Sequence, residues 1–176
     1  KYHIGGLIFM QGTPEKQAEL NNSFQAKSKI PLLIGFDGEW GLDMRLKDTY
    51  RFPWNMTLGA IKDNSLITAF GVQVGQHCKR LGIHINFAPV VDVNTNPENP
   101  IIGNRSFGEN RDNVTDKALA FVQGMQSQHV LANAKHFPGH GDTATDSHKL
   151  LPVLNFEIEE NSGLAIQFSP IKLLIT

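Results

Sequence analysis

Four short apolar runs, each followed by a polar loop, constrain the fold of this chain more than any other feature. They cover residues 4–10, 32–37, 83–91 and 130–136. Valine, isoleucine and leucine crowd these runs without regular polar alternation, which is typical of parallel strands covered on both faces. The sequence therefore predicts four buried parallel strands.

Helical patterns fill the intervals between these strands. Thr13 is followed by a proline, so a helix with Thr13 as its cap is expected to begin there. A second helix is predicted over residues 65–81, with Asn64 as its cap and Gly82 just past its end. A third is predicted over about residues 113–128. Strands and helices in alternation indicate βαβ units around a parallel sheet.

The loops after the strands favour a barrel over an open sheet. Polar segments rich in glycine and proline occupy residues 37–46, 92–108 and 136–148. An active site built from several strand ends is typical of (β/α)8 barrels, and no Gly-x-Gly-x-x-Gly motif indicates a dinucleotide fold. Barrels usually need about 250 residues. The 176 residues thus predict an α/β fold of the TIM-barrel type, present as an incomplete barrel of about four to five βα units.

Composition excludes several functional classes. The formal net charge of −1 gives no electrostatic reason to expect nucleic acid or an anionic membrane surface as a partner. The single cysteine, Cys78, excludes an internal disulfide and any multi-cysteine metal site. No apolar run approaches the roughly 20 residues of a membrane span. The chain starts at Lys1 without an initiator methionine, so we expect a fragment, and its ends do not distinguish a cytoplasmic from a periplasmic or exported protein.

The segment from residue 135 to 148 carries the clearest chemistry, because three of the seven histidines lie there on a glycine-rich loop. Asp146 and His148 are two residues apart, so in an extended segment they project to the same side. The carboxylate can then orient the imidazole as an acid or base. A surface pair without a role is the alternative. A loop-borne metal site at His140, Asp142 and His148 is a further alternative, ranked below acid–base chemistry.

Other strand ends supply charged partners. Asp37, Arg45 and Arg105 follow predicted strands, and carboxylate and guanidinium groups that converge there could hold the hydroxyl groups of a sugar. A structural ion pair is the alternative for each of them, and it is the preferred interpretation for Asp92 and Glu39. Two loop tryptophans could stack on a sugar ring, although packing is the favoured use of both; they are Trp40 and Trp54.

These motifs together resemble the N-terminal (β/α)8 domain of glycoside hydrolase family 3, in its β-N-acetylglucosaminidase (β-hexosaminidase) branch. The resemblance covers essentially all of residues 1–176, which we expect to form part of that catalytic domain. Lys-His-Phe-Pro-Gly-His-Gly followed by Asp-x-His is its most specific element. The matching segments are 35–39, 44–46, 86–92, 104–108 and 135–148.

The resemblance implies residue roles and a reaction. His148 matches the general acid/base of this branch, with Asp146 as its partner. Terminal β-linked N-acetylglucosamine is the implied substrate, often from peptidoglycan fragments, and no cofactor is implied. The implied mechanism is double displacement with retention, through a covalent glycosyl–enzyme intermediate. The positions that match those holding the sugar next to the cleaved bond are Asp37, Arg45, Arg105, Lys135 and His136.

One departure from the family pattern concerns the nucleophile, an aspartate in a later strand-end loop. After His148 the acidic residues are Glu157, Glu159 and Glu160, none in a matching motif. We therefore expect this polypeptide to be inactive alone, and its unpaired sheet edges to be covered either by self-association or by flanking sequence. Three alternatives stay open: a β-glucosidase of the same family, which would lack the Asp-x-His pair; a non-catalytic sugar-binding module; and a metal-dependent hydrolase.

Overall fold

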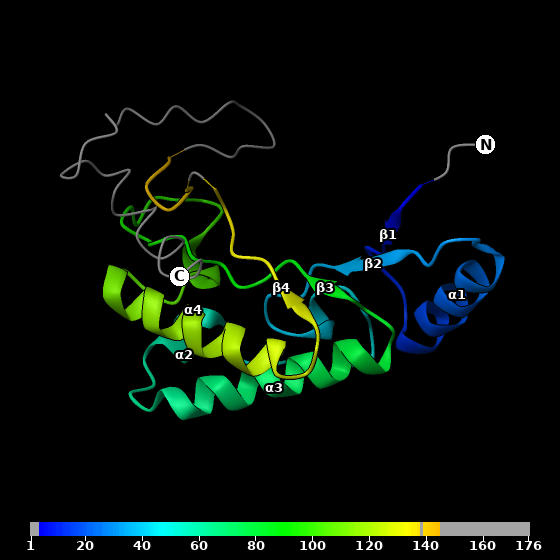
Figure 1. The fold of residues 1–176 in the computed structure, drawn as a ribbon. Coiled ribbons are helices and arrows are strands. Elements are labelled where there is room, and N and C mark those ends of the chain that lie inside the picture. The colour runs from blue at the N-terminus through cyan, green and yellow to red at the C-terminus, as the bar shows by residue number, and fades with distance from the viewer. Residues whose placement is uncertain (1–3, 138, 145–176) are drawn as a thin grey trace. The chain divides into compact units, whose positions relative to one another are not determined.

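A computed structural model describes residues 4–137 and 139–144 of the chain (Figure 1). The described residues form two compact units. The first holds those within 1–52, 68–88 and 121–133, and the second holds the remainder. Two helices, α3 (Asn64–Arg80) and α4 (Arg111–Gln126), contribute their N-terminal residues to the second unit and their C-terminal residues to the first.

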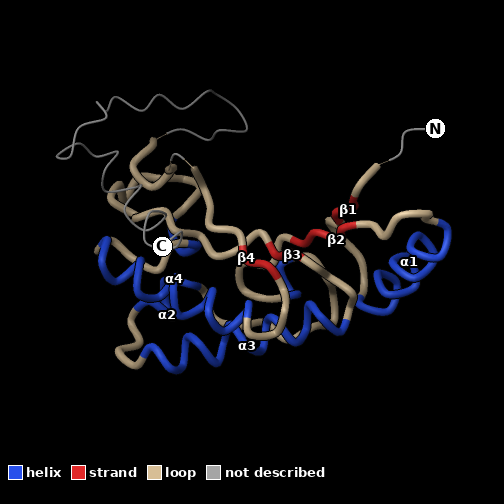
Figure 2. Tube along the Cα trace, in the orientation of Figure 1, coloured by secondary structure: helices blue, strands red, loops and turns tan. Residues whose placement is uncertain are grey.

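The first unit is built on a parallel sheet of four short strands, in the order β1-β2-β3-β4 (Figure 2). The prediction of a four-stranded parallel sheet is confirmed. Each strand is shorter than its apolar run, since the residues at the two ends of the run lie outside the hydrogen-bonded strand. The strands are β1 (Gly6–Ile8), β2 (Leu33–Phe36), β3 (Ile85–Asn86) and β4 (Leu131–Ala132).

Burial in this sheet is one-sided at several positions. Ile34 and Phe36 are fully buried, whereas Leu33, directly before Ile34, is 50% exposed and Leu131 in β4 is 55% exposed. Successive strand residues point to opposite faces, so β2 buries one set and leaves part of the other open. The prediction that the strands are covered on both faces is wrong at these positions. An apolar run specifies a strand, but what covers its second face depends on other elements.

The helices begin close to the predicted residues. Thr13 caps α1 (Pro14–Lys27), since its Oγ1 accepts the Lys16 N–H at 3.3 Å. The α3 cap was predicted one residue late: Oδ1 of Asp63 accepts the Ser65 N–H at 2.9 Å. Hydrogen bonds from Ser65 lower the pKa of the Asp63 carboxyl. Gly82 adopts φ +70° beyond α3, as the expected C-terminal glycine does.

Helices α3 and α4 approach closely within the first unit. A Cβ on Gly71 would lie 2.3 Å from the Phe121 carbonyl oxygen, and one on Gly124 would lie 2.1 Å from the Thr68 carbonyl oxygen. Glycine is therefore required at both positions. The rings of Phe70 and Phe121 pack beside this crossing, 5.1 Å apart between centroids. The pair of helices buries the apolar core of this unit.

The second unit contains α2 (Asn55–Gly59), a 3₁₀ turn η2 (Gly103–Arg105) and the loops after β3 and β4. A second 3₁₀ turn, η1 (Leu42–Met44), belongs to the first unit. Backbone hydrogen bonds join the two loops of the second unit: Val91 N–H donates to the Lys135 carbonyl at 2.6 Å, and Asn96 N–H donates to the Gly141 carbonyl at 3.3 Å. These bonds place residues 89–108 against residues 134–144.

Candidate active site

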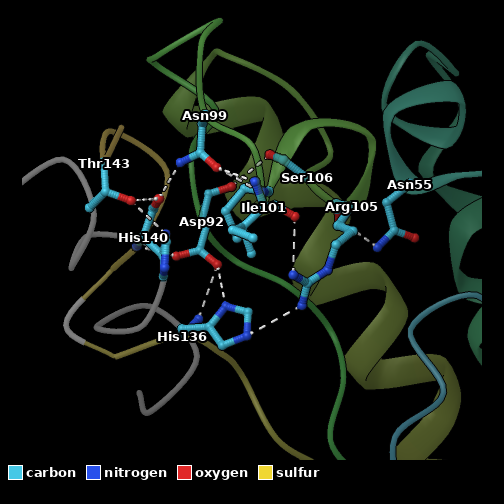
Figure 3. A network of polar contacts seen from close by, with 10 residues as sticks. Asn55, Asp92, Asn99, Ile101, Arg105, Ser106, His136, His140 and Thr143 are labelled. Carbon is cyan, nitrogen blue, oxygen red and sulfur yellow. Dashed lines mark hydrogen bonds and ion pairs between the residues drawn. The ribbon is translucent and has the colours of Figure 1, made fainter. Parts of the chain in front are cut away.

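Asp92 is the centre of a polar network in the second unit (Figure 3). Its side chain is 0% exposed and accepts three hydrogen bonds. Oδ1 accepts the His140 backbone N–H at 2.7 Å. Oδ2 accepts the His136 backbone N–H at 3.2 Å and lies 2.6 Å from His136 Nδ1. A buried carboxylate is costly unless hydrogen bonds satisfy it, and all three of these bonds come from the loop after β4.

His136 links Asp92 to Arg105. Its side chain is 36% exposed, so part of the ring is reachable from solvent although both of its nitrogens have a partner. A guanidinium nitrogen of Arg105, Nη2, lies 3.4 Å from His136 Nε2, and Nη1 donates to the Ile101 carbonyl at 3.1 Å. Asn55 Nδ2 donates to the Arg105 carbonyl at 2.9 Å. The guanidinium and the imidazole are therefore both held in place.

A second part of the network fixes the turn at residues 139–143. Asn99 Nδ2 donates to the His140 carbonyl at 2.6 Å, and Asn99 Oδ1 accepts the Ile101 and Ile102 N–H groups. His140 is 8% exposed, with Nδ1 lying 2.6 Å from Thr143 Oγ1. Its Nε2 is buried and has no hydrogen-bond partner among the described residues. The rings of His136 and His140 lie 6.3 Å apart between centroids.

Asp142 lies on the same turn. Its Oδ1 is buried without a hydrogen-bond partner in the described part of the chain. Burial raises the pKa of the Asp142 carboxyl, and the charge of Asp92 adds to the rise, while His140 opposes it. The folded protein therefore disfavours the ionised form of Asp142.

Replacing Asp142 with asparagine is expected to raise the thermal midpoint at pH 7. The folded carboxyl has a pKa above its ordinary value of 3.8, so wild-type stability from this group is complete below 3.8 and is lost as the pH rises through the folded pKa. The increase in thermal midpoint that Asp142→Asn gives over the wild type should therefore shrink as the pH is lowered. Thermal unfolding from pH 7 to pH 4.5 measures it, with Asp112→Asn, an exposed carboxylate, as control. A pH-independent gain would contradict this account.

The first unit holds a separate ion pair at the end of β2. Asp37 Oδ2 contacts Arg45 Nη2, with side chains 17% and 25% exposed respectively. The Asn86 side chain ties the adjoining turn, accepting the Gly38 N–H at 2.8 Å and donating to the Gly38 carbonyl at 3.1 Å. Asp37 and Arg45, both predicted to bind the sugar, thus contact each other, and this ion pair does not decide between sugar binding and the structural role that was the alternative.

The predicted site residues are distributed over both units. Arg105, Lys135 and His136 belong to the second unit, and Arg105 and His136 are in contact there. Lys135 is half-buried, and its backbone forms an isolated parallel bridge with Val90. Asp37 and Arg45 belong to the first. The predicted acid/base pair, Asp146 and His148, lies outside the described residues.

Two alternatives from the sequence can be compared with the described residues. Among these residues no group of three or more histidine, cysteine, aspartate or glutamate side chains is placed to hold a metal ion; His148 lies outside them. The Arg51 guanidinium lies 5.9 Å from the centroid of the Trp40 ring, so one face of that tryptophan is engaged by a cation. Trp54 is half-buried at the N-terminus of α2.

Sequence reasoning assigned Asp92 a structural ion pair and gave no role to Asn99, Ser106 or Thr143. Asp92 does contact a basic side chain, that of His136, one of the predicted sugar-binding residues, through a hydrogen bond to Nδ1. The spacing of 44 residues between the two gave no local signal. One signal could have found the contact. Polar residues follow the carboxyl ends of both β3 and β4, and these strands are neighbours in the parallel sheet.

Comparison with known proteins identifies the family. The sequence matches the glycosyl hydrolase family 3 N-terminal domain over residues 1–168. The chain belongs to glycosyl hydrolase family 3. A β-hexosaminidase A from Pseudoalteromonas piscicida is 41% identical over 165 residues, covering 86% of this chain and 28% of that protein. A Cellulomonas fimi protein named β-N-acetylglucosaminidase/β-glucosidase is 32% identical, covering 90% of this chain and 28% of its own length.

A solved family 3 structure agrees with the fold. The β-N-acetylglucosaminidase from Paenibacillus sp. str. FPU-7 superposes with a TM-score of 0.87 at 38% identity, covering 97% of this chain and 34% of that one. The α/β fold with four parallel strands is thus that of part of a family 3 barrel domain. The chain spans less than a third of the two curated relatives named above. No helix within the described ranges is long and apolar enough to cross a bilayer.

Proposed function

We propose that the protein containing this chain is a retaining β-N-acetylhexosaminidase that removes terminal β-linked N-acetylglucosamine. The observation that carries the proposal is the contact of Arg105 with His136 in a family 3 chain whose relatives are named β-hexosaminidases. The network holds a cation and an imidazole at a partly open site. Donors and acceptors fixed in this way suit the hydroxyl groups of a sugar. Residues 1–176 are proposed to be part of the catalytic domain.

The proposed sugar-binding residues supply complementary groups. Arg105 and Lys135 are donors without acceptor capacity, and His136 carries one donor and one acceptor when neutral. Asp37 accepts hydrogen bonds from sugar hydroxyls while Arg45 holds its carboxylate. Charge-assisted hydrogen bonds of this kind fix the orientation of the sugar ring. Holding the substrate in the reactive orientation is the contribution of these residues to catalysis.

His148 is proposed as the general acid/base, with Asp146 holding its imidazole. Protonating the leaving oxygen and then activating water are steps that one group with a pKa near neutrality can perform in turn. The proposed double displacement uses a carboxylate nucleophile, and Glu157, Glu159 and Glu160 lie in no matching motif. The polypeptide of 176 residues alone is therefore proposed to be inactive. Fragments of peptidoglycan are the proposed natural substrates.

A β-glucosidase is the second candidate, because the Cellulomonas fimi relative is named for both activities. The two candidates differ in the substituent at the sugar C2, an acetamido group or a hydroxyl. A site with hydrogen-bonding groups fixed for the acetamido group would discriminate strongly against the sugar that lacks it.

The deciding assay compares nitrophenyl β-N-acetylglucosaminide with nitrophenyl β-glucoside, using the protein that contains these residues. We expect kcat/KM to favour the N-acetyl sugar by roughly a hundredfold, and product NMR taken early in the reaction to show the β-anomer first. A preference for the glucoside would replace the proposal with the second candidate. Binding of N-acetylglucosamine without turnover of either substrate would indicate a sugar-binding module.

A further inference from the structure

We propose that Asp92 is a positioning residue that fixes the protonation pattern of His136. It holds the proton on Nδ1 and thereby leaves Nε2, which faces Arg105, as a hydrogen-bond acceptor. Its other oxygen anchors the following turn through His140. The proposal rests on the proposed function in one respect, the assignment of sugar binding to His136.

Counting donors and acceptors gives the tautomer. Asp92 Oδ2 lies 2.6 Å from His136 Nδ1, and a carboxylate oxygen accepts, so Nδ1 carries the proton. Arg105 Nη2 lies 3.4 Å from His136 Nε2, and a guanidinium only donates, so Nε2 must accept. Each of the two contacts requires the same neutral tautomer. A ring with its proton on Nε2 would set two donors against each other at Arg105 and two acceptors at Asp92.

The placement of Asp92 suits this task better than a purely structural pair. Its side chain is fully buried, whereas the His136 side chain is 36% exposed, so the carboxylate is closed to solvent while part of the ring it contacts can be reached. The Asp92 backbone is also held, because its carbonyl accepts the Ser106 hydroxyl at 2.6 Å. Salt and solvent screen a buried contact only weakly.

The two oxygens of Asp92 divide their bonds between ring and turn. Oδ2 takes both His136 donors, and Oδ1 takes the His140 N–H at 2.7 Å. One side chain therefore sets the rotation of the His136 ring and the start of the turn over residues 139–143. A loop held in this way presents its polar groups in one orientation, which is the condition for selective binding.

The fixed tautomer determines the direction of the hydrogen bonds that a ligand can form with His136. A hydroxyl that approaches His136 Nε2 must donate its proton and accept from a neighbour such as Arg105. Asp92 thus fixes which partner donates and which accepts beside His136, without touching the sugar.

The first test is the tautomer of His136 in the unliganded protein. Two-bond ¹H–¹⁵N correlation spectra of ¹⁵N-histidine-labelled protein, with His136→Gln for assignment, distinguish the two neutral forms. We expect the proton on Nδ1 in wild type. In Asp92→Asn an amide NH₂ replaces one acceptor, so we expect the Nε2–H form to appear. A wild-type ring protonated on Nε2, or on both nitrogens at neutral pH, would overturn the proposal, and this wild-type measurement does not depend on the folding of Asp92→Asn.

The second test is a double-mutant cycle on kcat/KM for the N-acetylglucosaminide. Asp92→Asn is expected to lower kcat/KM by about 10- to 30-fold, mainly through KM, as the loss of a charged hydrogen bond predicts. In a His136→Gln background the same change should cost less than about threefold, because the residue through which Asp92 acts is gone. Asp112→Asn, the same change at a carboxylate that is 76% exposed, should leave activity unchanged.

The outcomes separate this proposal from the proposed function. Equal losses from Asp92→Asn in both backgrounds would overturn the positioning role and leave the hexosaminidase assignment standing. If the Nδ1–H tautomer is lost in Asp92→Asn, but the protein neither cleaves nor binds N-acetylglucosaminides, the fixing of the tautomer is supported and the sugar-binding role of His136 is overturned.

Discussion

His148→Ala is expected to lower kcat/KM for nitrophenyl β-N-acetylglucosaminide by roughly 10²- to 10⁴-fold, the usual contribution of general acid–base catalysis. The effect should depend on the leaving group, because protonation matters less when the departing phenolate is already stable. A dinitrophenyl glycoside is therefore expected to lose much less in formation of the glycosyl–enzyme intermediate than an unsubstituted phenyl glycoside. Steady-state and burst kinetics on a series of aryl glycosides measure this dependence.

Asp146→Asn should reproduce part of the loss, since an amide accepts one hydrogen bond but supplies no charge to the imidazole. The control is His129→Asn, at an exposed residue with φ +63°, a conformation that asparagine tolerates. It should leave kcat/KM unchanged. A loss at His148 that is the same for every leaving group would contradict the acid/base role, and full activity of His148→Ala would remove it.

Much of the fold could be predicted from the sequence because local signals agree there. Apolar runs bounded by glycine and proline placed the four strands, and Thr13 and Gly82 marked the start of one helix and the end of another. The predictions failed where local signals are ambiguous. Asp63 and Asn64 are both good caps, so the sequence left a one-residue choice. The exposure of Leu33 depends on what packs against the sheet, which no run of apolar residues encodes.

The site was less predictable, because its contacts join distant positions. Arg105 and His136 were selected by motif, and they do meet, but the carboxylate that orients His136 was assigned a structural role. A local pattern cannot show that Asp92 faces a residue 44 positions away. The parallel sheet brings the two together, since β3 and β4 end side by side. Buried polar groups of this kind need the fold before their partners can be named.

Asp37→Asn is expected to raise KM for the N-acetylglucosaminide by about a hundredfold, because it removes an acceptor of charge-assisted hydrogen bonds from sugar hydroxyls. Its carboxylate is 17% exposed and paired with Arg45. If the pair is only structural, the variant should instead unfold at a lower temperature. Its KM, measured at a temperature where it is still folded, should then equal that of the wild type. Initial rates across substrate concentration, together with thermal unfolding, separate the two results.

The chain provides a closely matched control in the same loop. Asp43 pairs with Arg51 at 3.2 Å, and like Asp37 and Arg45 these residues are eight positions apart. The arginine of this second pair is 55% exposed, against 25% for Arg45, and an exposed pair contributes little to stability. Asp43→Asn should therefore change neither KM nor the midpoint appreciably. Equal KM changes in both variants would show that the loop responds to any lost ion pair, and Asp37 would lose its assignment as a sugar-binding residue.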